Sequence, residues 1–207
     1  MGRDISTFRR RDSSLKPQAQ VLVICEDTKS CKSYLEDAKA HFRANALIEI
    51  VNVGHTDPRG IVEKAIERKA KYDRLYCVID RDTHPTFDEA VNLARSCAKV
   101  SMIVSHPCYE FWLYLHFQYS RKAYMRSGGA SPGQQMLRAL KQLEGMAEYD
   151  KGKVHNLFQV LLPRLPQAIL NAEKAAAEAK EVGEPNPSTG IHLLLEEFES
   201  LGQPKKL

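Results

Sequence analysis

Two aspartates follow an apolar segment near the middle of the chain. In "RLYCVIDRDTHP" the run 74–79 is rich in β-branched and aromatic residues, and Asp80 and Asp82 come directly after it. In extended backbone these two side chains point to one side while Arg81 points to the other. Mg²⁺ prefers a few carboxylates, with its other positions filled by water and phosphate oxygens. The pattern therefore predicts a site for Mg²⁺ (or Mn²⁺).

A third acid, Glu26, follows another apolar run, "VLVIC". Ligands of open α/β sheets collect at the carboxyl ends of the parallel strands. If the two runs are neighbouring strands, Glu26 lies beside Asp80 and Asp82, and three acids this close repel one another unless a cation is bound. The other interpretation is that the aspartates only end a strand and cap the next helix, because Asp is common in turns.

The elements that would position these acids alternate along the first half of the chain. Four β-rich runs predict strands at 21–25, 47–53, 74–79 and 100–104. Helical periodicity predicts helices at 30–44, 58–71 and 87–98. We therefore expect an α/β fold with a largely parallel, four-stranded sheet flanked by helices.

After residue 104 the strand signal disappears and helices are expected instead. These are predicted at 107–117, 134–143, 155–162, 166–180 and 191–201. Ser188 or Thr189 can cap the last of them. The expected organisation is a basic, disordered arm (1–18), an α/β domain (19–120) and a helical C-terminal region packed on it (121–207).

Composition narrows the functional classes. The 207 residues are 43% hydrophobic, which is enough for a buried core. No apolar run approaches the roughly 18 residues of a membrane span, and the start lacks a secretory signal, so we expect a cytoplasmic protein without a membrane partner. The five cysteines form no C-x-x-C pair, and no P-loop motif occurs, which argues against a zinc site and against ATP hydrolysis by this chain.

Basic residues are concentrated at the start of the chain, although the net charge is only +4. An arginine-rich arm can contact phosphates, and a solvated tail is the alternative. We expect a nucleic-acid partner, contacted by Arg9, Arg10, Arg11, Lys29, Arg81 and Lys151.

Two other D-x-D chemistries fit less well. A haloacid-dehalogenase phosphatase carries D-x-D on its first strand, with Thr or Val two positions after the second Asp, where this chain has His84. A sugar-nucleotide transferase has no further support in the sequence.

Several ordered motifs resemble one protein family. A glutamate closing the first strand and D-x-D closing a later one look like the Toprim domain of topoisomerases, primases and OLD-type nucleases. More specifically, "VLVICE", "YCVIDRDTHPTFDEA", "SHPCYEFWLYLHF", "YDKGK" and "PNPSTGIHLLLEEF" resemble the RloB family of small, Toprim-related proteins encoded near restriction and abortive-infection loci. The chain departs from the family pattern at Asp27, where glycine is common.

The resemblance implies Mg²⁺-dependent phosphodiester chemistry. Asp80 and Asp82 would hold the metal, and Glu26 would be a further ligand or a general acid/base. A catalytic contribution is also implied for Glu110 and for His192. For each of these two there is a simpler interpretation: Glu110 as a surface residue at the edge of its helix, and His192 as a polar residue at a helix start.

Two further histidines stand near these motifs. His84, next to the aspartates, either contacts a phosphate or leaving group or makes a backbone hydrogen bond in a turn. His116 lies off the helical face of Glu110, and a core histidine is expected there.

Taken together, the sequence predicts a Mg²⁺-dependent nuclease of DNA or RNA, including tRNA, that acts in antiphage defence. The resemblance implies an ATPase partner, and the sequence leaves monomer and homodimer open. The main alternative is a non-catalytic Toprim-like module that binds nucleic acid or the ATPase. A metal-dependent phosphatase is a third.

Overall fold

A central sheet positions the candidate site. The computed structural model describes residues 18–27, 29–54, 57–81, 84–151 and 156–203. Asp82 and the arginines at positions 9, 10 and 11 lie outside these ranges. The sheet has the order β2-β1-β3-β4-β5. The strands are β1 (Val21–Cys25), β2 (Ile48–Val51), β3 (Arg74–Asp80), β4 (Val100–His106) and β5 (Ser188–Thr189).

The first four strands are parallel, as the alternation of strands and helices predicts. β1 is buried on both faces because its side chains point alternately into two cores. Val21 and Val23 enter one apolar cluster, whereas Leu22 and Ile24 enter the other. β1 and β3 are therefore central strands whose carboxyl ends must lie side by side.

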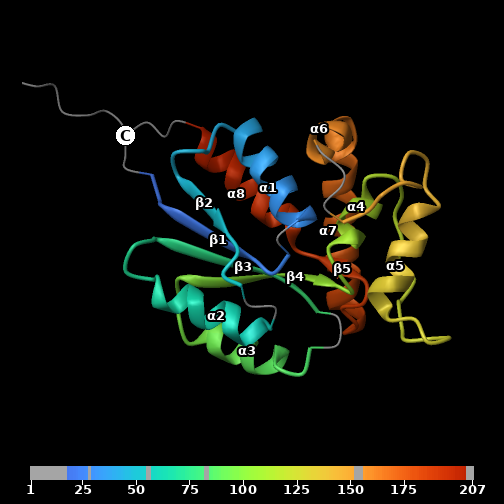
Figure 1. Ribbon diagram of the computed structural model, residues 1–207, viewed down its shortest axis with the longest axis horizontal. Helices are drawn as coiled ribbons and strands as arrows, with labels where there is room; N and C mark the ends of the chain where they lie inside the picture. The colour runs from blue at the N-terminus through green and yellow to red at the C-terminus, as the bar shows by residue number, and fades with distance from the viewer. Residues whose placement is uncertain (1–17, 28, 55–56, 82–83, 152–155, 204–207) are drawn as a thin grey trace, which may run out of the picture.

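Helices cover both faces of the sheet (Figure 1). On one face lie α2 (Pro58–Glu67) and α3 (Phe87–Arg95). On the other lie α1 (Ser30–His41) and α8 (Ile191–Gly202). The start of α2 follows from local sequence: the Asp57 side chain accepts a hydrogen bond from Gly60 N, and proline occupies the first helical turn.

A fifth strand corrects the expectation of four. β5 pairs antiparallel with the end of β4, which itself continues beyond residue 104 to His106. The Ser105 and Thr189 hydroxyls are hydrogen bonded across this pair at 2.8 Å. Two residues inside a proline-containing loop are too few to show strand periodicity. Gly190, not Ser188 or Thr189, is the N-cap of α8, although Thr189 Oγ1 accepts a hydrogen bond from Ile191 N.

The aromatic segment forms a shorter helix than expected. α4 begins at Glu110 and ends at Leu115, whereas the sequence predicts a helix over 107–117. Its Phe111 and Trp112 side chains are fully buried, and His116 is a core histidine whose Nδ1 lies 3.0 Å from Trp112 O.

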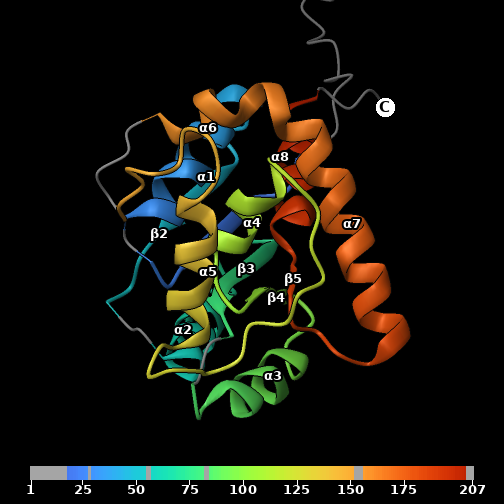
Figure 2. The same cartoon turned by 90° about the vertical axis from the view of Figure 1, so that its right-hand side faces the viewer.

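The C-terminal helices pack against α4 and α1. They are α5 (Pro132–Lys141), α6 (Leu157–Leu161), the 3₁₀ turn η2 (Leu162–Arg164) and α7 (Leu165–Val182). α4 contacts both α5 and α7 and lies between them (Figure 2). Side chains of these helices belong to the same apolar cluster as one face of the sheet. Within the described ranges, no helix has the length and apolar character needed to cross a bilayer.

Candidate functional site

Glu26 and Asp80 lie beside each other at the carboxyl ends of β1 and β3. Glu26 N donates to Val78 O at 3.1 Å, which extends the ladder between the two strands. The Glu26 carboxylate then turns toward β3, where its Oε2 accepts a hydrogen bond from Asp80 N at 3.1 Å. Burial raises the pKa of Glu26, partly offset by this hydrogen bond and by His84. Two of the three expected acids are thus in contact.

Asn52, which the sequence analysis does not single out, holds the backbone around Glu26. Its Nδ2 donates to Cys25 O at 2.9 Å and to Glu26 O at 2.8 Å, while its Oδ1 accepts from Gly54 N at 2.8 Å. The only sequence signal is an asparagine next to a glycine-containing turn after a strand. Asn52 ties the end of β2 to the residue that carries the candidate carboxylate.

Asp27, the position that departs from the family pattern, stabilises the start of α1. Its carboxylate accepts hydrogen bonds from the backbone N–H groups of Lys29, Ser30 and Cys31, at 2.9, 2.8 and 3.0 Å. These bonds satisfy amide groups that a helix start leaves without partners. Asp27 is therefore engaged with the helix, and the Lys29 side chain beside it is exposed.

Asp80 and Arg81 point in opposite directions, as expected for consecutive residues of extended chain. Asp80 Oδ1 accepts a hydrogen bond from Tyr109 N at 2.9 Å, at the entry to α4. The Arg81 guanidinium instead lies 4.2 Å from the centre of the Phe87 ring, on the α3 side of the sheet. Burial, together with the charges of Glu110 and Glu26, raises the pKa of Asp80 well above its usual range.

Glu110 is buried beneath this edge, so its interpretation as a surface residue is wrong. Only 1% of its surface is exposed, and its Oε1 accepts hydrogen bonds from Lys151 Nζ at 2.9 Å and from the Tyr149 hydroxyl at 3.3 Å. Its Oε2 has no hydrogen-bond partner within the described ranges. Burial disfavours the charged ammonium of Lys151, but Glu110 and Asp80 outweigh this effect and raise the Lys151 pKa.

A cleft of about 210 Å³ joins these residues to the start of α5. Ser131 and Gln134 form a capping box there: Ser131 Oγ accepts from Gln134 N at 3.2 Å, and Gln134 Oε1 accepts from Ser131 N at 2.9 Å. The positive end of a helix dipole thereby lies at the cleft. The sequence "SPGQ" carries the capping signal, but nothing in it indicates proximity to Asp80. The lining residues are Asp80, Cys108, Glu110, Ser131, Gly133, Gln134, Leu137 and Lys151.

The two candidate histidines are in different surroundings. His84 Nε2 lies 3.1 Å from Glu26 Oε1, so His84 contacts a candidate carboxylate directly. His192 is 4% exposed at the start of α8 and is not among the described residues that line the cleft. Burial lowers its pKa against the opposing influence of Glu196 and Glu173. The structure therefore joins His84 to the carboxylate edge and gives His192 no such contact within the described ranges.

The donor set at this edge fits a hard cation. Within the described ranges, no three His, Cys, Asp or Glu side chains form a group able to hold a metal ion, and Asp82, the third expected ligand, lies outside them. The described part contributes the carboxylate oxygens of Glu26 and Asp80. Glu110, whose buried Oε2 has no hydrogen-bond partner within the described ranges, is among the residues that line the cleft. Carboxylate oxygens suit Mg²⁺ or Mn²⁺ and do not suit a soft metal.

Comparison with models of protein families gives a match that covers most of the chain. The model of the RloB-like protein family matches residues 21–198, a span that includes every described residue lining the cleft. No curated protein and no solved structure matches the chain.

Proposed function

We propose, from the premise that the chain belongs to the RloB-like protein family, that it is a Mg²⁺- or Mn²⁺-dependent nuclease that hydrolyses phosphodiester bonds in nucleic acid. We further propose a Toprim-like arrangement of the α/β fold, a role in bacterial antiphage defence, and an ATPase partner. The observation that carries the proposal is the meeting of Glu26 with Asp80 at adjacent strand ends, beside a cleft that holds Glu110 and Lys151.

Glu26 and Asp80, together with Asp82, would hold the cation. A bound Mg²⁺ supplies charge stabilisation at phosphate oxygens and lowers the pKa of a bound water. The burial of like charges supports the proposal of a cation: burial, Glu110 and Glu26 raise the Asp80 pKa, and Lys151 and the Tyr109 N–H offset this only in part.

Lys151 is the residue best suited to receive the substrate phosphate. Its ammonium is held at the cleft by Glu110, and 44% of its side chain remains accessible to solvent. The adjacent N-terminal end of α5 adds partial positive charge. The cleft is smaller than the roughly 300–1,000 Å³ typical of small-molecule pockets. It therefore suits one phosphate group of a polymer whose remaining length lies outside.

Glu26 and His84 form the pair best suited to proton transfer. Their side chains are within hydrogen-bond distance, and burial raises the Glu26 pKa toward the range useful for general acid/base work. His84 thereby orients one carboxylate oxygen while Asp80 N orients the other. Two roles are open to Glu26, namely proton transfer and metal binding alone. The pH dependence of cleavage in a His84→Gln variant distinguishes between them.

The direct test is cleavage of labelled DNA, RNA and tRNA by purified protein with Mg²⁺ or Mn²⁺, with and without the ATPase encoded nearby. Wild type should cleave at least one substrate, and EDTA, Asp80→Asn and Glu110→Gln should each abolish cleavage. Asp37→Asn is the matched control, because Asp37 is an aspartate on α1 that is not among the described residues lining the cleft. Equal cleavage by wild type and Asp80→Asn, or nucleic-acid binding without cleavage in every condition, would contradict the proposal and favour the non-catalytic module.

A further inference from the structure

The outer edge of β2 offers backbone hydrogen-bonding groups. β2 pairs with β1 on one side, and within the described ranges no strand lies on its other side. Val21 N donates to Leu47 O and Val21 is in register with Ile48, so the odd-numbered residues of β2 bond to β1. The backbone groups of Ile48 and Ile50 consequently point outward. Ile48 N already donates to Ala44 O, whereas Ile50 presents both its N–H and its C=O.

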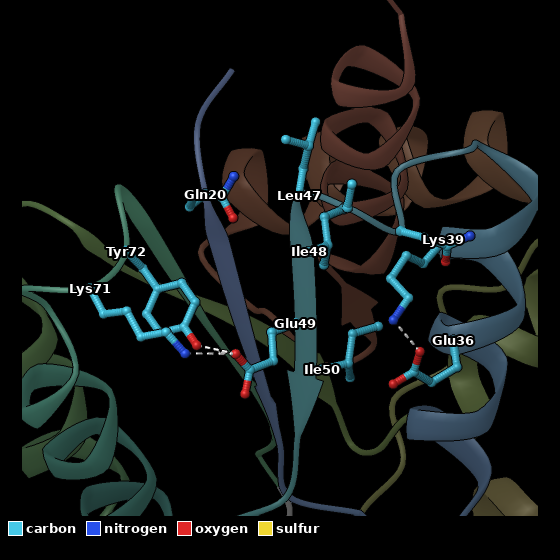
Figure 3. Close-up of a pocket in the computed structure, with 11 residues that line it drawn as sticks. Gln20, Glu36, Lys39, Leu47, Ile48, Glu49, Ile50, Lys71 and Tyr72 are labelled. Carbon is cyan, nitrogen blue, oxygen red and sulfur yellow. Dashed lines mark hydrogen bonds and ion pairs between the residues drawn. The ribbon is translucent and has the colours of Figure 1, made fainter. Parts of the chain in front are cut away.

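A groove of about 490 Å³ runs along this edge (Figure 3). Ile48 and Ile50 point to the α1 side of it, where Lys39 is paired with Glu36. On the opposite side Glu49 accepts a hydrogen bond from the Tyr72 hydroxyl and lies 3.3 Å from Lys71 Nζ. The groove thus carries one acid and one base on each side of the strand, and its charges balance.

The balance of charge in the groove indicates which kind of partner binds there. A polyanion such as nucleic acid needs an excess of basic residues, which this groove lacks. A groove with equal numbers of acids and bases pairs with a rotated copy of itself when the rotation brings the acids of one copy to the bases of the other, and homo-oligomers most often use such isologous interfaces. Edge strands usually carry charges that prevent pairing, but here Glu49 and Lys71 are paired with each other. Only 5% of the Ile50 surface is exposed, and Ile50 lines the groove with the outward side of its backbone.

We propose that two copies of this chain associate through their β2 strands, antiparallel about a two-fold axis at Ile50. Residues opposite each other in an antiparallel pair point to the same face, so a two-fold axis normal to the sheet must pass through a residue. With Glu49 on the axis, two like charges would be directly opposite. With Ile48 on the axis, its N–H is already used. Ile50 has both outward groups, and it can exchange two hydrogen bonds with Ile50 of the second copy.

With the two-fold axis at Ile50, the charged side chains of Glu49 and Lys71 from both copies also come close together. The two Glu49 residues become diagonal neighbours across the strands, with their Cα atoms about 7–8 Å apart. Each Lys71, whose side chain is 73% exposed, can then contact the acids of both copies. The result is one sheet that continues through both copies, with the two candidate clefts at opposite ends. The inference does not depend on nuclease activity.

Charge reversal with mixing tests this interface by sedimentation velocity at micromolar concentration. Wild type should be dimeric. Glu49→Lys gathers four bases at the axis and Lys71→Glu gathers four acids, so each variant should be monomeric alone. Mixed in equal amounts, the two variants should form a heterodimer, because the four charges then balance. Rescue on mixing requires a contact between copies, since each folded chain keeps its own altered pair.

Two further variants complete the test. Ile50→Pro removes the outward N–H without removing a bond to β1 and should also give a monomer, provided that circular dichroism shows it folded. Lys64→Glu reverses an exposed charge paired with Glu67 on α2 and should remain dimeric. A monomeric wild type overturns the proposal, as does a dimer that survives both single reversals, or two monomeric variants that do not associate when mixed.

Discussion

The pair formed by Glu110 and Lys151 should make stability depend asymmetrically on its two members. Glu110 is buried, whereas Lys151 is partly exposed. Replacing Lys151 by Met leaves a carboxylate buried without its cation. For a fully buried pair this costs about 3–5 kcal/mol. Water reaches Lys151 and screens part of the interaction, so we expect the free energy of unfolding to fall by about 1–3 kcal/mol.

The opposite substitution should cost less. Glu110→Gln removes the buried charge and preserves the shape of the side chain, while Lys151 can turn its ammonium toward solvent. Because Glu110 Oε2 has no partner in the described part of the chain, removing its charge also removes a desolvation cost. The double variant should therefore recover most of the stability lost in Lys151→Met.

Urea denaturation followed by circular dichroism measures these differences as a double-mutant cycle. For a chain of this length, 1 kcal/mol corresponds to a shift of about 2–4 °C in Tm, so thermal melts provide a second reading. Lys141→Met on α5 is the matched control, because it makes the same replacement at a lysine outside the cleft. The reasoning is refuted if Lys151→Met matches wild type, or if Glu110→Gln is the more destabilising change.

Three further outcomes are expected. Burial lowers the His116 pKa from 6.5 to about 4. As the pH falls, His116 is therefore protonated in the unfolded chain before it is protonated in the folded chain. Stability should drop by about 3 kcal/mol between pH 6.5 and 4, and a His116→Phe variant should lack this drop in urea melts at each pH. Asn52→Asp replaces the donor to Glu26 O with an acceptor and should slow any cleavage, whereas substrate affinity measured by anisotropy should change little. Asp27→Ala should lower the free energy of unfolding by about 0.5–2 kcal/mol, and Asp27→Ser should restore most of it in the same melts.

The sequence predicts the sheet well because its parallel strands are buried on both faces. The apolar runs predicted to end at Cys25 and at Ile79 correspond closely to β1 and β3, and their adjacency follows from the α/β alternation. β5 could not be predicted in this way. It is held by its pairing with β4 over only two residues, a contact between segments that are distant in the chain.

The sequence predicts those residues of the candidate site that directly follow or end a strand. Glu26 and Asp80 are found this way, whereas Asn52 is visible only once its contacts with the backbone of Cys25 and Glu26 are known. The buried Glu110 is paired with Lys151, which reaches it from a distant loop. Such contacts arise from tertiary packing, and no local pattern encodes them.

Binding of Mg²⁺ to the purified protein is the measurement that tests the central claim most directly. Isothermal titration calorimetry should show a site in wild type, and Mg²⁺ at 100 times its Kd should stabilise the fold by about 2.7 kcal/mol. Asp80→Asn should weaken binding at least tenfold, while the control Asp37→Asn should bind as wild type does. Absence of binding in wild type, or equal binding by wild type and Asp80→Asn, would contradict the assignment of a cation site to the carboxyl ends of β1 and β3.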